Sequence, residues 1–176
     1  HILSEEEKAI ALEETRQKNS SEEPEQLLLF QGPDCRRMAI PLANVCRLEE
    51  ISPTLLERVG KHDAIQYRNQ IMPLIYLAAV FGSDRNSRNS SLNSSLLSDE
   101  KLPVIVVSMD GENQVGLVVE RILDIVEQII EVKGAATQEG IEYCAVIQER
   151  VAEIIDIETV IRNNLFGSKQ MLVGTR

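Results

Sequence analysis

Few residues in this chain have side chains that could perform chemistry. His62 is the only internal histidine, and it lies between Gly60-Lys61 and an apolar run. A phosphate-accepting histidine is usually found on a bundle helix, so we expect neither a catalytic nor a phosphorylated His62. No GxGxxG or GxxxxGK[ST] loop is present to bind phosphate through backbone amides. The sequence therefore predicts no catalytic residues and no cofactor, and an enzyme with an unrecognised site is the weakest alternative.

The cysteines and carboxylates are no better placed for chemistry. Cys35, Cys46 and Cys144 have neither CxxC spacing nor histidine partners, so we expect idle thiols of a reducing cytoplasm and no metal site. Glu49 and Glu50 are adjacent, and on a strand they would point to opposite faces. They are expected to be solvated surface.

Charge and hydropathy exclude two kinds of partner. The net charge is -10 and the isoelectric point is about 4.8, whereas nucleic-acid binding requires a basic surface. No apolar run reaches the roughly 18 residues that a membrane-spanning helix needs. We therefore expect no nucleic acid, no membrane insertion and a cytoplasmic location.

The element best placed to present a functional side chain is residues 64–81, AIQYRNQIMPLIYLAAVF. Two apolar runs flank the polar triplet Arg68-Asn69-Gln70, and asparagine tolerates the left-handed conformation of a tight hairpin. Pro73 suits an edge strand or a strand start better than a central strand. Residues 77–81 lose the period of two and precede Gly82, which predicts one helical turn. The arginine is thus expected at a hairpin tip.

Other apolar runs extend the β pattern along the chain. Residues 27–30 and 38–42 predict a hairpin around Gly32-Pro33-Asp34, and residues 45–51 continue extended. Residues 55–59 fit a helical turn. Residues 102–109 and 114–119 predict a hairpin, and 123–132 fit a strand, with a helix as the alternative.

The C-terminal third is expected to add a last hairpin and a closing helix. Runs at 143–148 and 151–155 predict the hairpin, and Asp156 is a candidate N-cap for a helix over 157–166. Nine or ten short strands with small helices are typical of β-barrels or a sandwich. An aliphatic core is expected because only 3% of residues are aromatic.

Three segments are expected to lie outside the folded body. Residues 1–26 predict an acidic, partly helical lead-in, and the Ser/Asn-rich residues 83–100 a mobile loop. Residues 167–176 form a C-terminal tail. The domain itself is expected to occupy residues 27–166.

Four segments, in order, resemble the CheW-like domain. They are MAIPLANVCRLEEI, AIQYRNQIMPLIYLAAVFG, PVIVVSMDGENQVGLVVERILDIVE and CAVIQERVAEIIDIETVI. The runs LLLF, RLEEI and QYRNQIMPL look more like the C-terminal regulatory domain of CheA-type, possibly hybrid, histidine kinases than like free-standing CheW. Asn69 departs from the family's usual glycine and Glu120 from its usual aspartate.

The resemblance implies both fold and role. The fold is two small SH3-like five-stranded β-barrels sharing a core, with short helices and a C-terminal helix. The role is non-catalytic: a regulatory or scaffold domain that couples chemoreceptor cytoplasmic tips to a histidine kinase. Its partners would be receptor tips, other CheW-like domains and kinase domains of the parent chain, with a homodimer as a further option. A free-standing CheW-type adaptor is the alternative.

The resemblance also suggests binding residues. Arg68 corresponds to a functionally sensitive arginine of the family, and Glu50 to a glutamate that could pair with it across the barrel. A solvated turn arginine and a solvated glutamate are the competing interpretations. For an aliphatic docking surface the candidates, for each of which plain core packing is the alternative, are Leu27, Leu29, Met38, Ile40, Val104, Val106, Val115 and Leu117.

Overall fold

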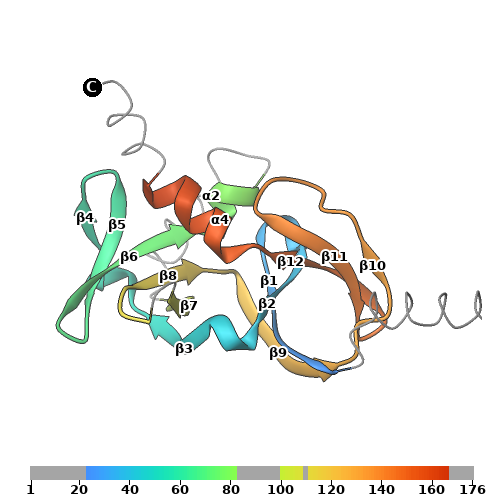
Figure 1. Cartoon of the computed structure of the whole chain (residues 1–176). Coiled ribbons are helices and arrows are strands. Elements are labelled where there is room, and N and C mark those ends of the chain that lie inside the picture. The colour runs from blue at the N-terminus through green and yellow to red at the C-terminus, as the bar shows by residue number, and fades with distance from the viewer. Residues whose placement is uncertain (1–22, 83–99, 109–110, 167–176) are drawn as a thin grey trace, which may run out of the picture.

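A computed structural model describes residues 23–82, 100–108 and 111–166, which form two β-barrels side by side (Figure 1). Barrel 1 has the strand order β10-β11-β12-β2-β1-β9, and barrel 2 the order β3-β7-β8-β6-β5-β4. The predicted mainly β fold with SH3-like barrels is confirmed. Each sheet has six strands where five were expected, because β10 and β4 are very short additional strands.

The strands have the following bounds. In barrel 1 they are β1 (Glu25–Gln31), β2 (Arg37–Pro41), β9 (Arg121–Gln128), β10 (Lys133–Gly134), β11 (Ile141–Ile147) and β12 (Arg150–Ile155). In barrel 2 they are β3 (Val45–Ile51), β4 (Glu57–Val59), β5 (His62–Tyr67), β6 (Gln70–Tyr76), β7 (Leu102–Ser108) and β8 (Gln114–Val118). The helices are η1 (Pro33–Cys35), η2 (Leu42–Asn44), η3 (Pro53–Leu55), α2 (Leu77–Phe81), α4 (Ile157–Ile161) and η4 (Arg162–Phe166).

Three aliphatic cores hold the barrels together. One fills barrel 1, one fills barrel 2, and a third lies between them and takes residues from both sheets and both α-helices. Strand β1 shows how: Leu27 and Leu29 face the barrel 1 interior, whereas Leu28 and Phe30 face the shared core. Successive residues of a strand point to opposite faces, so a strand between two cores must be apolar throughout.

Most element predictions are confirmed, and two are wrong. Residues 55–59 form the end of η3 and strand β4 instead of a helical turn. Pro73 lies in β6, an interior strand between β5 and β8. It is tolerated there because β6 pairs with β8 only from Leu74 onward, so proline sits just before the second ladder begins. Residues 121–128 form a strand, which decides between strand and helix for that run.

The two halves of the chain repeat one order of elements and exchange their first hairpins. Each half has a hairpin, four further strands and a five-residue helix; α2 begins at Leu77 and α4 at Ile157, eighty positions later. Hairpin β1–β2 completes the barrel formed by β9 to β12, and hairpin β7–β8 completes the barrel formed by β3 to β6. The parallel contacts β12–β2 and β6–β8 are the equivalent junctions. The shared core therefore joins two covalently linked, mutually exchanged units.

The predicted segments 1–26, 83–100 and 167–176 fall mostly outside the described residues. Within the described residues, no helix is long and apolar enough to cross a membrane.

Candidate partner-binding site

Arg68 lies at the tip of the β5–β6 hairpin, at the free end of barrel 2 (Figure 1). It and Asn69 have φ values of 50° and 64°, the left-handed conformation that a two-residue hairpin turn requires. The predicted hairpin is therefore confirmed, although neither residue is glycine. The guanidinium is exposed and lies over the Tyr67 ring, 5.7 Å from its centroid.

Tyr67 anchors this tip to strand β3. Its hydroxyl donates a 2.7 Å hydrogen bond to Oε1 of Glu49. Burial, followed by this bond, raises the pKa of Tyr67. Arg68 is therefore attached to a hairpin that Tyr67 holds in place. Its guanidinium forms no ion pair with another described residue, so its hydrogen-bond donors can bind a partner.

Glu50 is exposed on β3 and does not pair with Arg68; its neighbour Glu49 bonds to the hairpin instead. Adjacent strand residues point to opposite faces, so only one of the two glutamates can reach Tyr67. The suggested Arg68–Glu50 ion pair is not formed among the described contacts.

The eight aliphatic candidates are core residues. Val115 is 6% exposed, and the other seven are fully buried: Leu27, Leu29, Met38, Ile40, Val104, Val106 and Leu117. Their strands lie between two cores, so neither face is available to a partner. The prediction of a docking surface at these positions is corrected to core packing, the alternative that the sequence had left open. The unbroken apolar runs LLLF and VIVV, without polar alternation, were the signal for burial on both faces.

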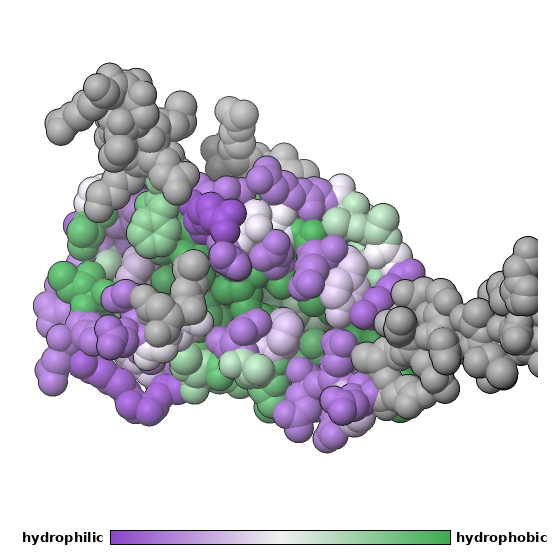
Figure 2. All heavy atoms as spheres, in the orientation of Figure 1, coloured by the Kyte–Doolittle hydropathy of each residue, from purple (hydrophilic) through white to green (hydrophobic). Residues whose placement is uncertain are grey.

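Other aliphatic side chains are exposed, and four of them fall at equivalent places in the two barrels. Ile71, on β6 just after the Arg68-Asn69 tip, is 67% exposed, and Val151, on β12 just after the Gln148-Glu149 tip, is 64% exposed. Leu48 on β3 and Ile125 on β9 are 41% and 56% exposed. In Figure 2 hydrophobic side chains interrupt the hydrophilic surface, including at the barrel 2 end. Such apolar positions rimmed by charge are typical of interfaces.

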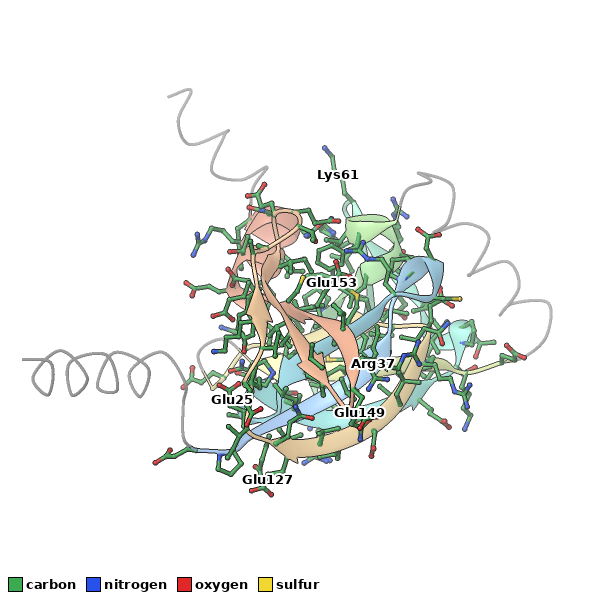
Figure 3. All side chains as sticks on the ribbon, turned by 90° about the vertical axis from the view of Figure 1, so that its right-hand side faces the viewer. Glu25, Arg37, Lys61, Glu127, Glu149 and Glu153 are labelled. Carbon is green, nitrogen blue, oxygen red and sulfur yellow. The ribbon has the colours of Figure 1, made fainter. Side chains whose placement is uncertain are left out.

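The equivalent tip of barrel 1 is held by polar side chains. Gln148 and Glu149 have φ values of 52° and 64°. The backbone amide of Gln148 donates to Oε1 of Gln128 at 2.9 Å. Nη2 of Arg37 donates to the side-chain oxygen of Gln148 at 3.1 Å. Figure 3 shows Glu25, Glu127 and Glu149 around this end, with Arg37 beside Glu149, so the end carries charges of both signs.

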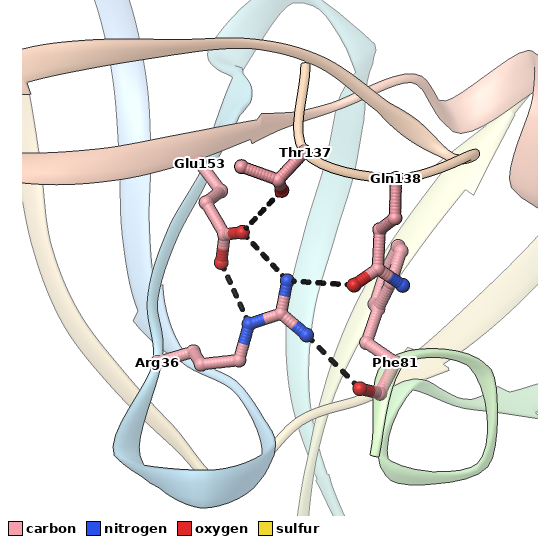
Figure 4. Close-up of polar contacts among 5 residues, drawn as sticks. All are labelled: Arg36, Phe81, Thr137, Gln138 and Glu153. Atoms are coloured by element: carbon pink, nitrogen blue, oxygen red, sulfur yellow. Dashed lines mark hydrogen bonds and ion pairs between the residues drawn. The ribbon is translucent and has the colours of Figure 1, made fainter. Parts of the chain in front are cut away.

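A second polar cluster lies where barrel 1 meets α2 (Figure 4). Arg36 donates from Nε and Nη2 to the two oxygens of Glu153 at 2.7 and 2.6 Å. Its Nη1 donates to the Phe81 carbonyl oxygen at 2.9 Å, and Thr137 Oγ1 donates to Glu153 at 3.0 Å. The hydrogen bond from Arg36 lowers the pKa of Glu153, and the same bond raises the pKa of Arg36. Sequence reasoning missed this pair, since its members are 117 positions apart.

The chemistry-bearing residues stay apart. All three cysteines are free; Cys35 and Cys46 are exposed, and burial raises the pKa of the half-buried Cys144. His62 is half-buried on β5. Among the described residues, no group of three His, Cys, Asp or Glu side chains could hold a metal ion.

Fold and site together define a two-barrel β domain with tethered hairpin tips and exposed aliphatic residues at both ends. The sequence model of the CheW-like domain matches residues 26–164, and the chain belongs to that family. Among solved structures it is similar to the scaffolding protein TtCheW from Thermoanaerobacter tengcongensis, with a TM-score of 0.61 and 15% sequence identity over 80% of this chain and 94% of that one. Comparison with the curated proteins finds no match.

Proposed function

We propose that this chain is a non-catalytic scaffold domain that couples chemoreceptors to a CheA-type histidine kinase through protein–protein contacts. Membership of the CheW-like family over residues 26–164 supports the proposal. The family's role is in the cytoplasm, where receptor tips and kinase meet.

The observation that carries the proposal is the tethered tip of barrel 2. Arg68 is exposed on a base fixed by the Tyr67–Glu49 hydrogen bond, and Ile71, which pairs with Gln66 in the same hairpin, is two-thirds exposed. Binding hot spots are enriched in tyrosine and arginine, the two side chains that Tyr67 and Arg68 stack together at this tip.

Barrel 1 carries an equivalent tip, with Val151 in the place of Ile71. The two tips lie at opposite ends of the molecule (Figure 1), so the domain can contact two proteins at once. The partners we propose are other CheW-like domains, whose barrels present the same kind of end.

The parent protein that we propose is a CheA-type kinase, because LLLF, RLEEI and QYRNQIMPL resemble its regulatory domain. A free-standing adaptor is the second candidate. Kinase sequence directly upstream in the gene would exclude the adaptor.

Substitution of Arg68 by alanine tests the proposal in a reconstituted assembly of receptor fragment, kinase and this domain. We expect Arg68→Ala to weaken receptor-dependent control of kinase activity while the melting temperature changes little, because the side chain is exposed. Arg162→Ala is the control, since it removes another exposed arginine, one on η4 outside the hairpin. Unchanged kinase control in Arg68→Ala would refute the role of this tip, and a large loss of folding would show that Arg68 is structural.

A further inference from the structure

Helix α2 connects the barrels. It follows β6 of barrel 2 directly, and its residues Leu77 and Phe81 are buried in the shared core. The Phe81 ring lies against Gly140, in the loop before β11 of barrel 1: a Cβ at Gly140 would lie only 3.1 Å from the ring. The end of α2 is therefore seated on barrel 1.

Arg36 bonds to both sides of this junction. Its fork binds Glu153 of β12, its Nη1 binds the carbonyl of Phe81, and its guanidinium lies 5.5 Å from the centroid of the Phe81 ring. Nη2 also donates to Gln138 at 3.2 Å, in the same loop as Gly140. The carbonyl at the end of α2, which has no partner within the helix, is thus satisfied by a barrel 1 side chain.

The energetic role of this cluster differs from that of the shared core. Aliphatic burial favours contact between the barrels but is non-directional. Arg36 and Glu153 both belong to barrel 1, and their bidentate pair fixes the plane of the guanidinium that binds the Phe81 carbonyl across the junction. With side-chain exposures of 21% and 15%, Arg36 and Glu153 are also sheltered from the solvent screening that weakens surface pairs.

The equivalent junction on the other side lacks this pair. Pro73 stands eighty positions before Glu153, at the corresponding place in β6, so β6 has no carboxylate in the place of Glu153. A hollow of about 180 Å³ lies beside it instead, lined by residues of β5, β6, α2 and η4, among them His62 and Asn164. Among the described residues, an arginine–carboxylate pair of this kind is thus found at one of the two junctions.

We propose that Arg36 and Glu153 form a latch that fixes the orientation of barrel 2 on barrel 1 through the end of α2. Arg36 is a positioning residue: it sets the angle between the two hairpin tips. The consequence for binding, namely the spacing of two docked partners, rests on the proposed function.

Inter-barrel distances measured between spin labels test the latch in the free domain. One label is placed on the native Cys46 of β3 and the other on Glu127→Cys of β9, in a background of Cys35→Ser and Cys144→Ala. We expect Arg36→Gln to shift or broaden the distance distribution. A pair within barrel 1, Glu127→Cys with Glu142→Cys and with Cys46 replaced by serine, is expected to stay unchanged.

Two further variants keep the test decisive. Glu153→Gln keeps the volume but removes the carboxylate charge that holds the Arg36 guanidinium against the Phe81 carbonyl, so it serves if Arg36→Gln fails to fold, and we expect a broadening in the same direction. Arg162→Gln, which breaks the exposed pair with Glu158, is expected to change nothing. Distances unchanged in the folded latch variants would overturn the proposal, as would broadening within barrel 1. Because no partner is present, this result is independent of whether the tips bind other proteins.

Discussion

The ionisation of Glu153 gives a prediction for a single side chain. Because the bond from Arg36 lowers the pKa of this carboxyl below its ordinary 4.5, the ionised group stabilises the fold above that value. This contribution is lost as the pH falls through the lowered pKa. At neutral pH we expect Glu153→Gln to reduce the free energy of unfolding by about 1.5–3 kcal/mol, the range for hydrogen bonds to charged groups.

Urea denaturation between neutral and acidic pH measures this effect. The difference in the free energy of unfolding between wild type and Glu153→Gln should become smaller as the pH falls. Glu158→Gln, which disrupts an exposed pair, should cost about 0–1 kcal/mol. A difference that persists in acid would show that the carboxylate charge is not the source of the stability.

Tyr143 provides a second test at the same scale, in the alkaline range. Burial first, and the nearby charge of Glu25 second, raise its pKa to about 12 from an ordinary 10. The neutral phenol therefore stabilises the fold below pH 10, and this contribution is lost as the pH rises through about 12.

Ultraviolet titration of phenolate absorbance checks this value. Tyr143→Phe should remove the step near pH 12, and Glu25→Gln should move that step to lower pH while leaving burial in place. A step unaffected by either substitution would contradict the assignment to Tyr143.

For individual residues, the sequence predicted which ones lie at hairpin tips better than it predicted which strand residues are exposed. Arg68 could be placed because a polar triplet between two apolar runs forms a hairpin whatever surrounds it. The docking positions could not, because exposure depends on the third dimension: Leu29 and Ile71 are both aliphatic strand residues, yet one is fully buried and the other 67% exposed.

Among the elements, β8 depends on a glycine. Gly116 pairs in parallel with Leu74 of β6, and a Cβ at this position would lie 2.6 Å from Leu74 Cδ2 and 2.8 Å from Val104 Cγ1. Overpacking of a tight core typically costs about 1–3 kcal/mol, so we expect Gly116→Ala to destabilise the domain by that amount. Chemical denaturation measures the loss.

Gly134→Ala is the matched control for β8. Its Cβ would have only ordinary contact, 3.8 Å from Cys144 Cβ, so its effect should be far smaller. Equal effects of the two substitutions would mean that the tight contact at Gly116 relaxes freely.

Element predictions failed where pairing partners decide the structure. Local patterns gave the hairpins, and the Asp156 cap of α4 is confirmed, since its carboxylate accepts from the Thr159 amide at 3.2 Å. Pro73 is different. The strand tolerates this proline because β8 pairs with β6 only from Leu74 onward, and β8 lies too far along the chain for a local pattern to predict that pairing.

In the whole molecule, the repeat and the hairpin exchange were not visible in the sequence. Equivalent positions hold unlike residues: Arg68 and Asn69 correspond to Gln148 and Glu149, and Pro73 to Glu153. Because the two halves share a backbone arrangement but not their side chains, only the pairing of the strands shows which positions are equivalent. The repeat explains why a small domain has two exposed tips of the same construction at opposite ends.

These equivalent ends give a prediction for the complete domain. Ile71→Lys and Val151→Lys each place a charge at a mostly exposed aliphatic position, so the free energy of unfolding should change by no more than about 0.5 kcal/mol. If each tip binds one CheW-like domain, each single substitution should halve the number of partners bound, and the double variant should bind none. Light scattering of mixtures with a purified CheW-like partner counts the bound copies. Asn44→Lys, at an exposed position of η2 between β2 and β3, adds the same charge outside both hairpins and should leave the count intact. A double variant that still binds two partners would place the docking surfaces elsewhere on the barrels.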